Sequence, residues 1–294
     1  MMLLHDFRKR FKINHPLVLD GAIGTELLLN RGSYNQYLWA SELNFTFPET
    51  VKSLHRKYLQ SGAQILSTNT FRTNFLSYKN SRLDIPYSSF VNNSVTLAKY
   101  FKDEFNFLLA GCNAPAEDCY QKERTLSKEL LHENHLRHIE ALYNSGVDFI
   151  LNETQSHLDE IEIISKYCST NKIPFVISLY FTEELKIFSG ESLFEVINIV
   201  ESFHPLAVSF NCITPSVFRK FMLTNILPKK WGLYLNCGSE YMKSEKLRCE
   251  VNPIDYAKIF QSIPLSNCEF IGSCCGSNHL HTKAIREYFD ENIN

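Results

Sequence analysis

Residues 19–27 read LDGAIGTEL, a short apolar run that ends at an aspartate and continues into two glycines. A strand followed by a glycine turn and then a helix is typical of α/β proteins. In an open dinucleotide-binding sheet the turn carries three glycines, spaced G-x-G-x-x-G. Here Gly21 and Gly24 are spaced G-x-x-G and the third glycine is absent. The turn therefore predicts an α/β fold and gives little support for a dinucleotide site.

The pattern of this first unit repeats along the chain, because short apolar runs alternate with longer amphipathic stretches. We predict strands at Leu17–Asp20, Gln64–Thr68, Phe107–Cys112, Asp148–Leu151, Phe175–Tyr180, Leu206–Phe210, Gly232–Leu235 and Glu269–Gly272. Helices are predicted at 48–62 and at 127–146, the second with Ser127 as N-cap. Eight strand-then-helix units favour a closed (β/α)8 TIM barrel over an open doubly wound sheet. No linker or repeat divides the chain, so residues 1–294 are predicted to form one domain.

The composition limits the possible partners and the compartment. Thirty basic and thirty-two acidic residues give a formal charge of −2, which argues against nucleic acid or an anionic membrane as the main partner. The N-terminus does not resemble a secretory signal, and no run approaches the roughly 18 apolar residues of a membrane span. We therefore expect a cytoplasmic protein in which most of the nine cysteines are reduced.

Polar side chains occur where the predicted strands end. They are Asp20, Asn69, Asn113, Asn152, Glu153, Asn211, Cys212, Asn236, Cys274 and Cys275. In a (β/α)8 barrel the carboxyl ends of all strands surround one mouth, where binding and catalytic sites are built. The sequence therefore predicts that these residues become neighbours.

The last strand leads into FIGSCCGSN at 270–278, which contains two adjacent cysteines. Catalytic zinc uses three protein ligands and keeps a fourth position open. Cys212 and the pair Cys274 and Cys275 could supply such a set across the mouth. Adjacent residues face opposite sides of a strand, so both can bind one ion only where the chain leaves the sheet. We expect Gly272 and Gly276 to provide that freedom.

Other interpretations of the cysteines and histidines remain open at this point. Cys274 and Cys275 could form a vicinal disulfide, and no C-x-x-C motif supports a zinc ribbon. Isolated cysteines are usually small buried apolar residues, which is the expectation for Cys168, Cys237, Cys249 and Cys268. The spacing of His132, His135 and His138 predicts a solvated helix surface. His279 and His281 could lie near the cysteine pair or at a helix start.

Together these segments resemble the homocysteine S-methyltransferase family. The resemblance rests on LDGAIGTEL at 19–27, GAQILSTNTFRTN at 62–74, NETQ at 152–155, SFNCITP at 209–215, YLNCGSEY at 234–241 and FIGSCCGSN at 270–278. The combination of an Asn-Cys segment with a late G-x-C-C-G motif is specific for this family, whereas each segment alone is not. The chain departs from the family pattern at Ser273, where glycine is usual, and at 277–279, where Thr-Thr-Pro is usual.

The resemblance implies a (β/α)8 barrel in which Cys212, Cys274 and Cys275 bind zinc. It also implies that Asp20 and Glu153 hold the amino group of homocysteine and that Asn236 lies near the site. We expect Asn69, together with neighbouring threonines and Asn113, to add polar contacts to the substrate.

The implied chemistry explains these residue types. Only a thiolate attacks a methyl group readily, and a zinc ion stabilises the thiolate of a bound substrate. A sulfonium donor leaves as a neutral thioether, so no catalytic residue is expected beyond the zinc-activated substrate thiol. We expect methyl transfer from S-methylmethionine or S-adenosylmethionine to homocysteine, forming methionine. The alternatives are a barrel that binds zinc and a thiol without methyl transfer, or a methyltransferase that acts on another thiol or a selenol.

Overall fold

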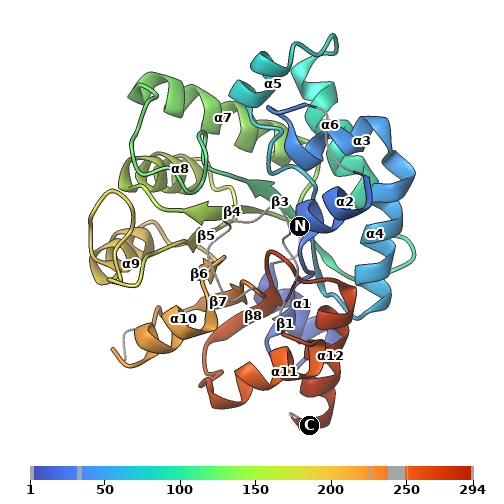
Figure 1. The fold of residues 1–294 in the computed structure, drawn as a ribbon, viewed down its shortest axis with the longest axis vertical. Coiled ribbons are helices and arrows are strands. Elements are labelled where there is room, and N and C mark those ends of the chain that lie inside the picture. Colours follow the sequence, from blue (N-terminus) through green and yellow to red (C-terminus); the bar gives the residue numbers. More distant parts are fainter. Residues whose placement is uncertain (1–2, 32–34, 225–226, 238–248, 250, 293–294) are drawn as a thin grey trace.

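The computed structural model describes residues 3–292 except 32–34, 225–226, 238–248 and 250 (Figure 1). The strands are β1 (Leu17–Val18), β2 (Ile65–Ser67), β3 (Leu108–Asn113), β4 (Phe149–Gln155), β5 (Phe175–Leu179), β6 (Ala207–Asn211), β7 (Trp231–Leu235) and β8 (Cys268–Ser273). The α-helices are α1 (Leu4–Phe11), α2 (Ile23–Arg31), α3 (Leu43–Thr46), α4 (Pro48–Gln60), α5 (Phe75–Ser81), α6 (Tyr87–Lys99), α7 (Lys128–Asn144), α8 (Leu158–Thr170), α9 (Leu193–Ser202), α10 (Pro215–Met222), α11 (Pro253–Lys258) and α12 (His279–Asn292). Short 3-10 helices lie at Trp39–Glu42 and Ile259–Ser262.

The eight strands form one parallel sheet in the order β1-β8-β7-β6-β5-β4-β3-β2. A parallel bridge between Leu19 and Ile65 joins the two ends of this order, and the N–H of Asp20 donates to the carbonyl of Ile65 at 3.0 Å. The sheet is therefore closed, and helices surround it (Figure 1). The predicted (β/α)8 barrel and its eight strands are confirmed.

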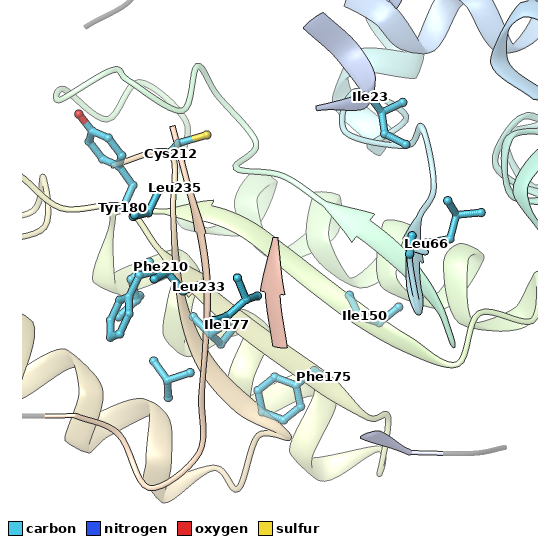
Figure 2. Packing of buried hydrophobic residues seen from close by; sticks show 14 of the residues in the cluster. Ile23, Leu66, Ile150, Phe175, Ile177, Tyr180, Phe210, Cys212, Leu233 and Leu235 are labelled. Carbon is cyan, nitrogen blue, oxygen red and sulfur yellow. The ribbon is translucent and has the colours of Figure 1, made fainter. Parts of the chain in front are cut away.

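The core has two parts, because successive side chains of a strand face opposite sides. In β4, Phe149 and Leu151 belong to the cluster that fills the barrel, whereas Ile150 belongs to the cluster between strands and helices. Figure 2 shows members of this outer cluster, including Ile150, Ile177 and Leu233. Both faces of each strand are buried, which explains why the strands appear in the sequence as continuous apolar runs.

The N-terminal helix α1 closes one end of the barrel. Its Leu4 and Phe7 are buried and belong to the same cluster as the barrel-filling residues. Arg8 pairs with Glu269 near the start of β8 at 3.4 Å. This end is therefore filled by apolar side chains, which leaves the opposite end, where the strands finish, for a site.

The two glycines of the first turn are explained by close packing. A Cβ on Gly24 would lie 2.3 Å from the ring of Trp39, and one on Gly21 would lie 2.9 Å from Tyr58. Gly24 therefore lets the ring of Trp39 pack on α2, and Gly21 lets Tyr58 of α4 approach the first turn. Of the described helices, none is long and apolar enough to cross a lipid bilayer.

The two helices predicted in detail are confirmed within two residues. Helix α4 begins at Pro48 and ends at Gln60. Helix α7 is preceded by Ser127, whose side chain accepts a hydrogen bond from the N–H of Leu130. This is the contact expected of an N-cap serine, which satisfies an amide in the first helical turn.

Candidate active site

A cavity of about 320 Å³ lies where the strands end. Its lining comes from distant parts of the chain, as is usual where the loops after the strands converge. Lining residues from the strand ends include Asp20, Asn69, Cys112, Glu153, Asn211, Cys212, Tyr234, Cys274 and Cys275. Most of the polar residues predicted to meet at the mouth therefore do so.

Three cysteine sulfurs lie together at this cavity. The Sγ atoms of Cys212 and Cys275 are 3.7 Å apart, and those of Cys274 and Cys275 are 4.0 Å apart. Sulfurs bound to one tetrahedral zinc ion at the usual Zn–S length of about 2.3 Å are separated by about 3.8 Å. The donor set and these two distances therefore fit a three-thiolate metal site.

The third sulfur pair has a different geometry. Cys212 and Cys274 are in disulfide contact, and together with Cys275 they form one group of three potential ligands. A metal ion needs both sulfurs as thiolates, so reduction must open this contact before an ion binds. The alternative of a vicinal disulfide between Cys274 and Cys275 is not what the structure shows, because these sulfurs are too far apart for a bond.

The backbone explains how residues at two strand ends face one point. Cys212 follows β6 with a φ of 55°, a conformation that few residues other than glycine adopt. Beyond β8 the chain leaves the sheet, and Gly276 has a φ of 83°. The N–H of Cys274 donates to Leu235 at 2.8 Å, and the N–H of Cys237 donates to Cys275 at 3.1 Å. These bonds hold the cysteine loop against the end of β7.

The expected role of Gly272 needs correction. This glycine lies inside β8 and is not among the residues with a positive φ, so it does not provide conformational freedom. A Cβ there would lie 2.8 Å from the Cβ of Leu19 and 3.0 Å from the carbonyl of Asp20. Gly272 is required because β1 and β8 approach closely at the mouth.

Two carboxylic acids also line the cavity. Asp20 is buried and accepts hydrogen bonds from the N–H and hydroxyl of Ser67, at 2.8 and 2.9 Å. Burial raises the pKa of Asp20 to about 8, against the effect of these hydrogen bonds. Burial also raises the pKa of Glu153 to about 7, against the opposite effect of the neighbouring Cys112 and Tyr234. A cationic group bound between the acids would favour their ionised forms.

The position of Glu153 rules out the competing interpretation of this residue. Without the family resemblance, Glu153 would be a first-turn glutamate of a helix. In the structure it lies within β4, which continues to Gln155, and helix α8 begins only at Leu158. Likewise, Asp20 bonds across to Ser67 of β2 and does not cap its own turn.

The two asparagines predicted to bind substrate have different surroundings. Asn69 lines the cavity, but its amide donates to Ala40 at 2.9 Å and to Asn44 at 3.0 Å. Asn236 is buried, and its backbone N–H donates to Ile213 at 2.9 Å. Asn236 lies outside the set of described residues that line the cavity. Contact of either residue with substrate stays a prediction.

The connection between β3 and α7 also reaches the cavity, which was not predicted from the sequence. Residues 118–120 of this connection line the cavity. Its two ends are fixed by Glu160 of α8, which accepts from the N–H of Ala116 at 2.8 Å and pairs with Arg124 at 2.9 Å. The buried carboxylate therefore positions a loop over the candidate site.

The prediction for the helix histidines is wrong at two of three positions. His132 is exposed, but His135 and His138 are fully buried on the inner face of α7. The Nε2 of His135 lies 2.7 Å from Glu160, and the Nδ1 of His138 lies 2.9 Å from the side-chain oxygen of Asn113. The apolar periodicity of α7 decides which face is buried, and these two histidines share that face with Ile139.

Replacing Glu160 with glutamine is expected to lower the free energy of unfolding at pH 7 by about 3 kcal/mol, because Arg124 would lose its buried partner. Burial opposes ionisation of Glu160, but His135, Arg124 and the N–H of Ala116 together lower its pKa to about 2. This contribution is complete above the ordinary pKa of 4.5 and is lost as the pH falls toward 2. Urea unfolding at pH 7 and at pH 3 should therefore show a smaller difference between the two proteins at pH 3.

The matched control for this variant is Glu133→Gln. Glu133 pairs with Arg137 at 2.9 Å on the outer side of α7, where both side chains are about half exposed. Its loss should cost about 0.5 kcal/mol or less. An equal effect of the two substitutions would show that the buried network does not fix the loop.

The comparisons with known proteins agree with this site. A family model described as homocysteine S-methyltransferase matches residues 17–289. Homocysteine S-methyltransferase 2 of Zea mays is 24% identical, over 95% of this chain and 91% of its own length. Homocysteine S-methyltransferase of Escherichia coli is 24% identical over 92% of this chain and 94% of its own. Selenocysteine Se-methyltransferase of Brassica oleracea var. italica is 23% identical, over 92% and 88%.

Solved structures show the same fold. The oxidised form of the homocysteine methyltransferase MmuM from Escherichia coli has a TM-score of 0.80 at 22% identity, covering 96% of this chain and 98% of that one. Its metallated form has a TM-score of 0.77 at 21% identity, covering 95% and 99%. The family model extends from the first strand into the last helix, and the chain therefore belongs to the homocysteine S-methyltransferase family.

Proposed function

We propose that this protein transfers a methyl group from a small onium donor to homocysteine and forms methionine, with zinc held by Cys212, Cys274 and Cys275. The observation that carries the proposal is the meeting of these three sulfurs and the two acids Asp20 and Glu153 at one cavity. One of the solved structures with the same fold is a metallated form, which supports a metal. We further propose that residues 1–294 act as one domain in the cytoplasm, where thiols stay reduced.

The cysteines and the substrate sulfur have separate tasks. When bound, zinc supplies a Lewis acid that keeps the homocysteine sulfur deprotonated at neutral pH. The three cysteines leave one position of a tetrahedral site for that sulfur. Their sulfurs belong to the lining of the cavity, so a ligand in the cavity can reach this position.

The two acids orient the substrate. Asp20 and Glu153 would bind the ammonium group of homocysteine, and such charge-assisted hydrogen bonds are stronger than neutral ones. Ser67 fixes the carboxylate of Asp20 through two donors, so its position does not depend on the substrate. Holding the ammonium group would set the direction in which the thiol approaches the donor.

The donor can be bound by aromatic side chains. Trp39 and Phe71 both line the cavity, and their ring centroids are 5.7 Å apart. A sulfonium is attracted to the face of an aromatic ring. The rings therefore suit an onium donor, a class that includes S-methylmethionine and S-adenosylmethionine, which we favour, and betaine.

The proposed reaction needs no acid or base from the protein. The thiolate electron pair of homocysteine forms the new bond to the methyl carbon. The bond between that carbon and the donor sulfur breaks, and its electron pair stays on the donor sulfur as a neutral thioether. Because the leaving group is neutral, no proton has to be supplied to it.

A second acceptor deserves consideration because two relatives are named selenocysteine methyltransferases. This chain also departs from the family pattern at Ser273 and at 277–279, next to the cysteine pair. We still favour homocysteine, since most of the named relatives act on it.

Competition between the two acceptors tests this choice. With zinc-loaded protein and S-methylmethionine, we expect kcat/KM for homocysteine to exceed that for selenocysteine. With homocysteine as acceptor, we expect kcat/KM for S-methylmethionine or S-adenosylmethionine to exceed that for betaine. Products would be quantified by mass spectrometry. A higher kcat/KM for selenocysteine would make selenocysteine the preferred acceptor. Binding of homocysteine without turnover for any donor would favour a thiol-binding barrel.

A further inference from the structure

A second group of metal-ligating side chains lies outside the cavity. It consists of Cys237, just beyond β7, Cys249, and His281 in the first turn of α12. The two Sγ atoms and the Nε2 atom of His281 all lie within 4.8 Å of one another. Cys237 and His281 are buried, and Cys249 is half-buried. None of the three is among the described residues that line the cavity.

The donor atoms of this group converge on one backbone carbonyl. The oxygen of Val251 lies 2.8 Å from the Sγ of Cys249, 3.1 Å from the Nε2 of His281 and 3.7 Å from the Sγ of Cys237. A carbonyl oxygen has two lone pairs and cannot fully satisfy three donors. A cation between the four atoms would be bonded by all of them.

The imidazole of His281 is held in a suitable orientation. Its Nδ1 lies 3.1 Å from the side-chain oxygen of Asn278. The backbone N–H of Asn278 also points at this nitrogen, at 3.2 Å, and the Nε2 on the other side of the ring lies 3.3 Å from the Sγ of Cys237. Metal-binding histidines are usually held by a hydrogen bond at the other ring nitrogen, which is where Asn278 contacts His281. Tyr256 also contacts the ring edge-on, at 5.7 Å between centroids.

We propose that Cys237, Cys249 and His281 bind a structural zinc ion, with the carbonyl of Val251 in the fourth position. Thiolate and imidazole ligands suit zinc, and four protein ligands make a closed site without a position for substrate. The ion would join the two described ends of the connection that follows β7.

The second site would support the first one. The N–H of Cys237 donates to the carbonyl of Cys275 at 3.1 Å, so the two groups are joined by one backbone hydrogen bond. An ion at Cys237 would fix the chain directly behind the cysteine loop. The proposal does not depend on methyl transfer, because its ligands take no part in that reaction.

A disulfide between Cys237 and Cys249 is the competing interpretation, since their sulfurs are in contact. The first cluster has the same arrangement, with Cys212 and Cys274 in contact and a third donor beside them. A disulfide would leave the Nε2 of His281 with the carbonyl of Val251 as a partner, beside a sulfur that offers no proton and accepts only weakly. The third donor therefore favours a metal ion.

Zinc content tests the proposal. Protein purified under reducing conditions and dialysed against zinc should contain about two zinc ions per chain. Cys249→Ser should contain about one, Cys275→Ser about one and the double variant almost none. The control Cys168→Ser, buried in α8, should keep both ions. A second measurement needs no variant: titration of the wild-type apoprotein with Co2+ should give thiolate absorption bands that saturate at about two equivalents.

The results that would overturn the proposal are distinct from those that concern the proposed function. If the wild-type protein binds only one ion, and that ion is lost in Cys275→Ser but kept in Cys249→Ser, the second site is refuted and the first remains. A peptide linked through Cys237 and Cys249 in wild-type protein held under reductant would assign the pair to a disulfide. Two ions without methyl transfer would support the second site and count against the proposed reaction.

Discussion

Replacing Cys275 with serine is expected to remove the ion of the first cluster and to lower kcat/KM for methyl transfer by about 10³-fold or more. Serine matches the size of cysteine but does not ionise at neutral pH, so the site loses one of three thiolates. The sulfur of Cys275 lies 3.7 and 4.0 Å from the other two, close enough for all three to bind one ion. Zinc content and initial rates with homocysteine would be measured on the same sample.

The control for this variant is Cys168→Ser. Cys168 is fully buried in α8 and lies outside both cysteine groups, so its replacement should change neither zinc content nor rate. Circular dichroism would show whether each variant is folded. A folded Cys275→Ser protein with wild-type zinc content and rate would show that the three-cysteine assignment is wrong.

Replacing Glu153 with glutamine should raise KM for homocysteine by about 30-fold to 100-fold while the zinc content stays unchanged. Glutamine keeps the size of the side chain but loses the charge that would bind the substrate ammonium. Glu153 also lies beside Cys112 and Tyr234, so the amide has polar neighbours within the site. Steady-state kinetics with homocysteine as the varied substrate would separate KM from kcat.

Glu162→Gln is the matched control for Glu153→Gln. Glu162 is exposed on α8, so its replacement should leave both kinetic constants unchanged. Loss of zinc from Glu153→Gln would instead make Glu153 a metal ligand or a residue needed for folding. An unchanged KM would remove it from the ammonium site.

The barrel could be predicted from the sequence because each parallel strand is buried on both faces and therefore appears as a short apolar run. Asp20, Glu153 and Cys212 could be placed at one mouth for a topological reason, since all strands of a barrel end there. The end of β4 was harder to predict. Its polar residues continue the strand to Gln155, so Glu153 lies on a strand and not at a helix start.

Other features depend on contacts that no local pattern reports. His135 and His138 were expected at the surface, but Glu160 and Asn113 satisfy them inside the protein. The 118–120 segment reaches the cavity because Glu160 holds the two ends of its loop, by a hydrogen bond from Ala116 and an ion pair with Arg124, and spacing alone does not show these contacts.

The second group was missed for the same reason. Cys237, Cys249 and His281 share no motif, and the two cysteines were expected to be ordinary core residues. Three elements bring them together: the end of β7, the segment before α11, and the start of α12. Only the packing of these elements shows that the ligands can act as one group.

The measurement that tests the proposed function most directly follows a labelled methyl group. Reduced, zinc-loaded protein would be incubated with homocysteine and S-methylmethionine carrying a ¹³C-labelled sulfonium methyl, and the products would be analysed by mass spectrometry. We predict labelled methionine over many turnovers, and its loss when zinc is removed by a chelator. Absence of labelled methionine with this donor, and also with labelled S-adenosylmethionine and betaine, from folded zinc-loaded protein would contradict the proposed function.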